Sequence, residues 1–85
     1  MKSFEYVITD EIGMHARPAG LLVKEAGKYT SKIVVKKGER EAAGTKLLAL
    51  MSLGIKQNDS ITVEVEGEDE EAAVQGMKDF FEGNL

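Results

Sequence analysis

The segment Ile61–Glu66 reads ITVEVE, and its strict alternation constrains the fold more than any other stretch of the chain. Its apolar residues point to one side of a strand and its polar residues to the other, so the strand belongs to a sheet with one buried face. The next segment begins with acidic residues over Glu68–Glu71 and then has apolar residues at helical spacing, which predicts a helix packed on that face. The inward positions of this helix are Ala73, Val74, Met77, Phe80 and Phe81.

The other elements follow from similar patterns and from turn residues. Pro18 suits the first turn of a helix, Gly38-Glu39 suits a hairpin, and Gly54 suits the end of a helix. The order strand, helix, strand, strand, helix, strand, helix predicts an α+β fold of two layers, with helices on one face of a mostly antiparallel sheet. The predicted elements are a strand over Phe4–Thr9, a helix from Pro18 to about Gly27, strands over Lys32–Lys37 and Arg40–Ala43, and a helix over Thr45–Leu53.

Length and composition predict one ordinary globular domain over residues 1–85. The chain is 42% hydrophobic and 31% charged, which is typical of a folded protein rather than a disordered one. It has no cysteine, so no disulfide or thiolate metal site stabilises the fold. Its first residues lack the continuous apolar run of a signal peptide or membrane span, and we expect a cytoplasmic protein without membrane insertion.

The net charge of −4 is unevenly distributed along the chain. Residues 14–56 carry a net charge of +6, whereas residues 57–85 carry −8. The basic middle lacks the aromatic residues and arginine cluster of a nucleic-acid surface, and the acidic segment would repel phosphate backbones. We therefore expect an acidic protein surface as partner, not nucleic acid.

Residues 13–20 read GMHARPAG and contain the only histidine and the only proline of the chain. The free amides and the dipole at a helix start attract anions and disfavour an imidazolium, so His15 is expected to be a neutral nucleophile there. A phosphoryl group on its ring would lie against the backbone amide of Ala16 and its neighbours. The guanidinium of Arg17 would donate two parallel hydrogen bonds to it.

A second interpretation of these residues stays open at this point. A lone histidine before a helix is more often a polar boundary residue than a catalytic one, and local spacing alone does not decide between the two. No second histidine provides a metal site, and no P-loop or serine nucleophile motif is present. Asp10 and Glu11 precede the histidine, and such adjacent acids are more often simply solvated.

Three segments together identify a family. GMHARPAGLLVKEA, LLALMSLGI and ITVEVEGEDEEAAV follow one another in register, and the chain closely resembles HPr, the histidine-containing phosphocarrier of the bacterial phosphoenolpyruvate:sugar phosphotransferase system. The resemblance implies an open-faced β-sandwich with a four-stranded antiparallel sheet and three helices. It also implies that His15 accepts a phosphoryl group at Nδ1 from enzyme I and donates it to enzyme IIA, supported by Arg17. We expect no metal or organic cofactor to take part.

The resemblance further implies an apolar surface beside the histidine to which partners bind. The second helix has more apolar residues than one buried stripe needs, so we assign Leu50 and Leu53 to the core and expect Leu47, Leu48 and Met51 to be partly exposed. Methionines suit a surface that accepts several partners, and transient binding of this kind suits a monomer. The expected partner-binding residues are Met14, Gly20, Leu47, Leu48 and Met51, with Arg17 and Lys24 at the rim.

Two positions depart from the family pattern. Many Gram-positive relatives have a regulatory serine where this chain has Lys46, so serine phosphorylation by the family's kinase is expected to be absent. Thr45 is expected to cap the second helix instead of replacing that serine. Ile12 stands where relatives often have a small polar residue, so any hydrogen bond from this position has to come from its backbone or from water.

Two other classes of function remain beside the transport carrier. The first is a regulatory protein, in which the same surface binds a transcription factor or metabolic enzyme and His15 reports the phosphorylation state. The second is a structural interaction module, which would not be phosphorylated at all.

Overall fold

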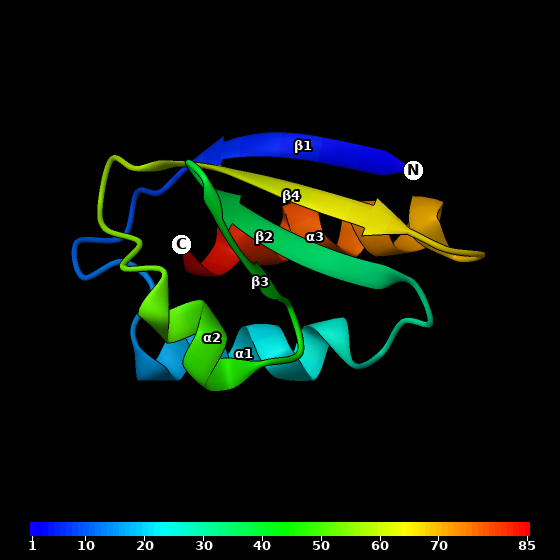
Figure 1. The fold of residues 1–85 in the computed structure, drawn as a ribbon, viewed down its shortest axis with the longest axis horizontal. Helices are drawn as coiled ribbons and strands as arrows, with labels where there is room; N and C mark the ends of the chain where they lie inside the picture. Colours follow the sequence, from blue (N-terminus) through cyan, green and yellow to red (C-terminus); the bar gives the residue numbers. More distant parts are fainter.

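The computed structural model describes residues 1–85 and has the predicted α+β architecture of a four-stranded sheet with three helices on one face (Figure 1). The order of elements along the chain is the predicted one. The seven elements are β1 (Lys2–Val7), α1 (Ala16–Ala26), β2 (Lys32–Lys37), β3 (Arg40–Ala43), α2 (Leu47–Ser52), β4 (Ser60–Glu66) and α3 (Glu70–Asn84).

All strand pairs of the sheet are antiparallel, in the order β1-β4-β2-β3. The alternating strand β4 is central, between β1 and β2, with Val63 opposite both Phe4 and Val35. Its inward residues Ile61, Val63 and Val65 are at most 1% exposed. The strand that most strongly predicted a one-sided sheet therefore forms the middle of that sheet.

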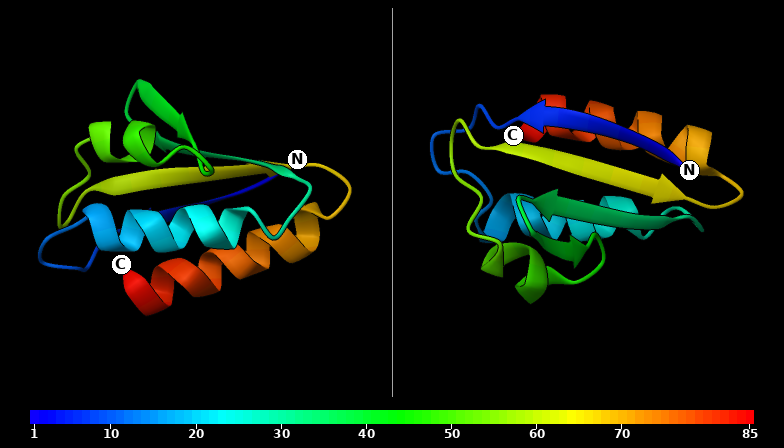
Figure 2. Two further views of the ribbon diagram at one scale, coloured as in Figure 1. Left: turned by 90° about the horizontal axis from the view of Figure 1, so that it is seen from below. Right: turned by 45° about the horizontal axis from the view of Figure 1, so that its top comes forward.

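The helices cover one face of the sheet, and α1 and α3 lie side by side across it (Figure 2). Phe81 of α3 is fully buried and makes edge-to-face contacts with the rings of Phe4 and Tyr6 from β1 and of Phe80. Ala19 and Leu22 of α1 and Leu50 of α2 complete the core and are also fully buried. None of the three helices has the length and apolar character needed to cross a membrane.

Some element ends differ from the sequence prediction. The first strand ends at Val7, because the N–H groups of Thr9 and Asp10 bond to the carbonyl of Leu85 instead of continuing the ladder. The second helix is also shorter than predicted, since it begins after Lys46. Thr45 is therefore not its cap, and no side chain caps this helix.

Candidate functional site

His15 lies at the predicted place, immediately before the first turn of α1. Its backbone is extended (φ −106°, ψ −174°), and its carbonyl accepts the N–H of Ala19 at 3.0 Å. The N–H groups of Ala16 and Arg17 have no acceptor in the protein, and no side chain caps the helix. Two free backbone donors and the positive end of the helix dipole therefore lie next to the imidazole.

The loop before His15 is shaped by Gly13, which has a φ of +81°. A Cβ at this position would come within 2.5 Å of the carbonyl oxygen of Ile55 and 2.8 Å of the Cα of Lys56. The neighbouring N–H of Met14 donates to that same Ile55 carbonyl at 3.0 Å. Only glycine permits both this backbone angle and this close approach, and the contact with the 55–56 backbone sets the position of His15.

The segment that contacts Gly13 is itself tied down by Asp59. The Asp59 carboxylate accepts the N–H of Lys56 at 2.8 Å and pairs with Lys37 Nζ at 2.9 Å. The hydrogen bond from Lys37, followed by that from the Lys56 amide, lowers the pKa of the Asp59 carboxyl. Lys37 Nζ also donates to the carbonyl of Gly54 at 2.7 Å, so strand β2 anchors the support of the site.

Asp10 organises the other half of the loop. Its Oδ2 accepts the N–H groups of Ile12 and Gly13, both at 3.0 Å, and the same oxygen lies 3.9 Å from Nε2 of His15. The side chains of His15 and Asp10 are 38% and 37% exposed. The expectation that Asp10 is simply solvated is therefore wrong. Ile12 has an apolar side chain, which is 67% exposed, so its only polar contact here comes from its backbone. Its N–H donates to the Asp10 carboxylate and not to the His15 ring.

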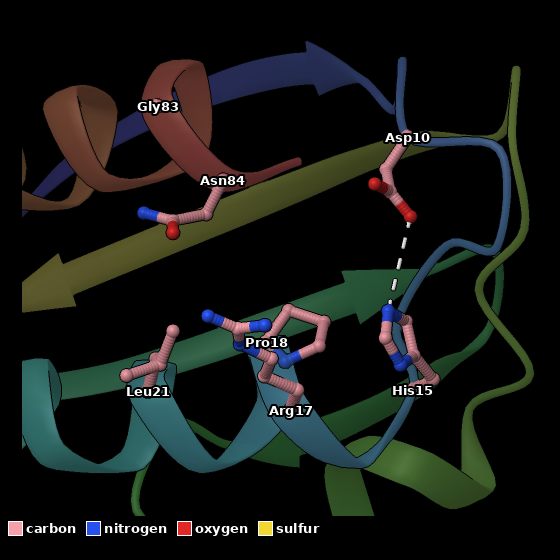
Figure 3. Close-up of a pocket in the computed structure, with 7 residues that line it drawn as sticks. All are labelled: Asp10, His15, Arg17, Pro18, Leu21, Gly83 and Asn84. Atoms are coloured by element: carbon pink, nitrogen blue, oxygen red, sulfur yellow. Dashed lines mark ion pairs between the residues drawn. The ribbon is translucent and has the colours of Figure 1, made fainter.

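A shallow cleft of about 290 Å³ opens beside His15 (Figure 3). Asp10 and Arg17 line it with His15, and Arg17 pairs with no carboxylate within 4.0 Å. Figure 3 shows the Arg17 guanidinium pointing along the cleft and away from the imidazole. His15 and Arg17 thus share one cleft without direct contact. The other lining residues are Pro18, Leu21, Gly83 and Asn84.

The sequence does not place four of the residues that line this cleft: Asp10, Leu21, Gly83 and Asn84. A local signal exists for Asp10, because an aspartate carboxylate commonly accepts the backbone N–H groups two and three residues later and so closes a turn. No local signal places Asn84 beside His15, since α3 reaches the cleft only through the tertiary fold. Asn84 Nδ2 donates to the carbonyl of Phe80 within its own helix.

The structure brings most of the expected partner-binding residues to the surface. Leu47, Leu48 and Met51 of α2 are 40%, 79% and 37% exposed. Leu50 and Leu53 are buried, so the predicted division of this helix into core and exposed residues is confirmed. Arg17, Gly20 and Lys24 form an exposed stripe on α1, and Lys46 is also exposed.

Met14 differs from its expected place on that surface. It is only 5% exposed and belongs to the hydrophobic core. The turn at Gly13 points it inward, and its amide is bonded to Ile55. Met14 therefore packs beneath the site instead of enlarging the exposed apolar surface.

The chain contains no group of three or more His, Cys, Asp or Glu side chains placed to hold a metal ion. The groups that the site presents are the imidazole of His15, the guanidinium of Arg17, the carboxylate of Asp10 and the two free backbone amides. These groups match a nucleophile that receives an anionic group.

Comparison with known proteins agrees with this chemistry. A family model described as the PTS HPr component phosphorylation site matches residues 2–83. The phosphocarrier protein HPr of Mycoplasma genitalium is 45% identical over 86 residues, which cover 99% of this chain and 97% of that protein. The fold is similar to that of HPr from Thermoanaerobacter tengcongensis, with a TM-score of 0.92 and 36% sequence identity. The match covers 98% of this chain and 93% of that one.

A further solved structure is Crh, the catabolite repression protein of Bacillus subtilis, which was solved as an intertwined, domain-swapped dimer. It is 27% identical, has a TM-score of 0.79, and the match covers 100% of this chain and 98% of that one. The family model matches nearly the whole chain, a curated relative is 45% identical, and the histidine precedes free helix amides. This protein therefore belongs to the HPr family of phosphocarrier proteins.

Proposed function

We propose that this protein is a general phosphocarrier that accepts a phosphoryl group from enzyme I on Nδ1 of His15 and donates it to enzyme IIA. The observation that carries the proposal is the position of His15, next to two backbone N–H groups that lack acceptors. A phosphoryl group on the ring brings charge to a place where these donors and the helix dipole stabilise it. Membership of the HPr family supports the same assignment.

The transfer needs no acid, base or metal from this chain. The Nδ1 electron pair of His15 forms a bond to phosphorus, while the bond from phosphorus to the donor's nitrogen breaks and its electron pair stays on the donor ring. Reversal of these steps on the enzyme IIA side releases His15 in its original state. The protein contributes positioning and electrostatic stabilisation.

Arg17 provides the positive charge that pairs with a phosphoryl group on His15. Its guanidinium is exposed, forms no ion pair and lies in the same cleft as His15. Because no bond within the protein has to break, the side chain is free to turn toward a phosphoryl group on His15. A guanidinium donates two parallel hydrogen bonds to such a group, and a lysine does not match this geometry.

We propose that partners bind the docking surface formed by Leu47, Leu48 and Met51 with the α1 stripe Arg17, Gly20 and Lys24. Gly20 has no side chain, and a Cβ built there meets no atom within 4 Å. A partner can therefore approach the helix backbone closely between Arg17 and Lys24. The exposed apolar side chains provide area that water leaves on binding, and the basic rim steers acidic partner surfaces toward it.

Incubation with enzyme I and phosphoenolpyruvate tests the proposal. We expect an acid-labile addition of one phosphoryl group by intact-mass spectrometry, and its loss in His15→Ala. An unmodified wild-type protein, or a modified His15→Ala variant, refutes the assignment. Arg17→Ala is expected to slow transfer with a free energy of unfolding within about 0.5 kcal/mol of wild type, because its side chain is exposed and unpaired. An unchanged transfer rate removes Arg17 from the mechanism.

The likeness to Crh favours a second candidate, a regulatory protein whose phosphorylation state controls a metabolic enzyme or transcription factor. Binding partners captured separately by the phosphorylated and unphosphorylated protein distinguish the two functions. Lys46 replaces the family's regulatory serine, so we propose that the serine kinase does not modify this position. We further propose a monomer, which light scattering at several protein concentrations tests.

A further inference from the structure

We infer that Asp10 is a positioning residue for the phosphoryl transfer: it keeps the proton of the neutral His15 ring on Nε2 and thereby leaves the Nδ1 electron pair free. The inference rests on the proposed function and extends it to a residue outside the GMHARPAG segment. Its basis is that one carboxylate oxygen of Asp10 both closes the loop and faces the ring.

The Asp10 carboxylate is fixed in place before any substrate arrives. Its Oδ2 accepts two backbone N–H groups of the loop, from Ile12 and Gly13, at 3.0 Å. The backbone of Asp10 is held as well, since its N–H donates to the carbonyl of Leu85 at 2.8 Å. Because both the side chain and the backbone of Asp10 are hydrogen bonded, its carboxylate has a fixed position, unlike that of a freely rotating surface acid.

The imidazole presents Nε2 to this charge and turns its other nitrogen away (Figure 3). The Nε2 to Oδ2 distance of 3.9 Å is too long for a direct hydrogen bond but close enough for a solvent-screened electrostatic interaction, or for one bridging water. A neutral imidazole has one proton to place. A carboxylate beside Nε2 favours the proton there, so Nδ1 becomes the nucleophile.

The same arrangement assists both directions of transfer. When the Nδ1–P bond forms and the donor bond breaks, the ring keeps its Nε2 proton and gains positive charge, which the Asp10 carboxylate stabilises. When the phosphoryl group leaves, the electron pair returns to Nδ1 and the ring is neutral again. No proton enters or leaves the ring during the cycle.

Asp10→Asn tests the inference because the amide oxygen preserves an acceptor for the loop amides and only the charge is lost. Glu11→Gln is the matched control. It removes the same charge from the adjacent residue, which is exposed and makes no hydrogen bond or ion pair. Both variants are phosphorylated by enzyme I under single-turnover conditions, and ¹⁵N spectra of His15 report which nitrogen carries the proton.

We expect Asp10→Asn to slow phosphorylation by about two- to fivefold, the range for a partly exposed charge pair, and Glu11→Gln to leave the rate unchanged. We also expect a smaller share of the Nε2–H form in Asp10→Asn alone. Equal rates in the two variants overturn the inference. A slower rate with unchanged proton placement also overturns it, because Asp10 then acts through the loop only. If wild-type His15 is not phosphorylated at all, the proposed function fails instead.

Discussion

Gly13 is the position at which a single methyl group should do the most damage to both fold and site. In Gly13→Ala the residue has to adopt a φ of +81°, which costs an L-residue about 1–2 kcal/mol. The new Cβ also meets the Ile55 carbonyl oxygen at 2.5 Å, and neither backbone yields easily. Forced overpacking of this kind costs about 1–3 kcal/mol. The expected loss is therefore about 2–5 kcal/mol of unfolding free energy.

Two other glycines separate these contributions. Gly38 has a φ of +60° with no atom within 4 Å of a built Cβ, so Gly38→Ala should cost only the backbone term, about 1–2 kcal/mol. Gly20 is helical and equally open, so Gly20→Ala should stabilise the protein by about 0.5–1 kcal/mol.

Urea unfolding of the three variants, followed by circular dichroism, measures the differences. For 85 residues the expected total stability is about 4–13 kcal/mol, so Gly13→Ala should remove a large part of it. The melting temperature should fall by roughly 5–6 °C for each kcal/mol lost. A Gly13→Ala loss no greater than that of Gly38→Ala would refute the idea that contact with Ile55 sets this turn.

Two further predictions concern acid stability and the docking surface. Hydrogen bonds from the Ser31 hydroxyl, then from backbone amides, lower the folded-state pKa of Asp69 below its unfolded value. The stabilisation by Asp69 is therefore present above its unfolded-state pKa and is lost as the pH falls through its folded-state pKa. The urea midpoint of the wild type should decrease below about pH 4. We expect this decrease to be smaller in Asp69→Asn and unchanged in the control Asp79→Asn, whose side chain is exposed. On α2, Leu50→Ala should lose about 2–5 kcal/mol of stability, whereas Leu48→Ala should stay within about 0.5 kcal/mol and instead weaken binding of enzyme I in titration calorimetry; the reverse pattern contradicts the proposed docking surface.

The sequence predicts the number, type and order of the elements because each has a strong local periodicity. The alternation of Ile61–Glu66 and the apolar stripe after Pro18 depend on neighbours within one element, and both are confirmed. The ends of elements are less predictable. Thr45 has the chemistry of a helix cap, but the turn closed by the N–H of Lys46 on Ala43 delays the helix start by two residues.

The site was predictable in its local part only. The entry of His15 into a helix follows from Pro18 and the apolar residues after it, and the structure confirms that entry. The orientation of Met14 and the approach of Asn84 depend instead on contacts far apart in sequence, with Ile55 and with the cleft that α3 completes. No periodicity within residues 13–20 contains that information.

These long-range contacts explain how His15, the proposed nucleophile, can be positioned on an exposed loop without a deep pocket. Each end of the loop before His15 is bonded to backbone from another part of the chain: the amides of Thr9 and Asp10 bond to Leu85, and that of Met14 bonds to Ile55. The segment before β4 and the residue that follows α3 therefore fix the loop, while the His15 ring stays partly exposed and the two helix amides stay free of protein acceptors. A carrier has to expose its phosphoryl group to successive proteins, so rigidity has to come from the supporting backbone rather than from enclosure.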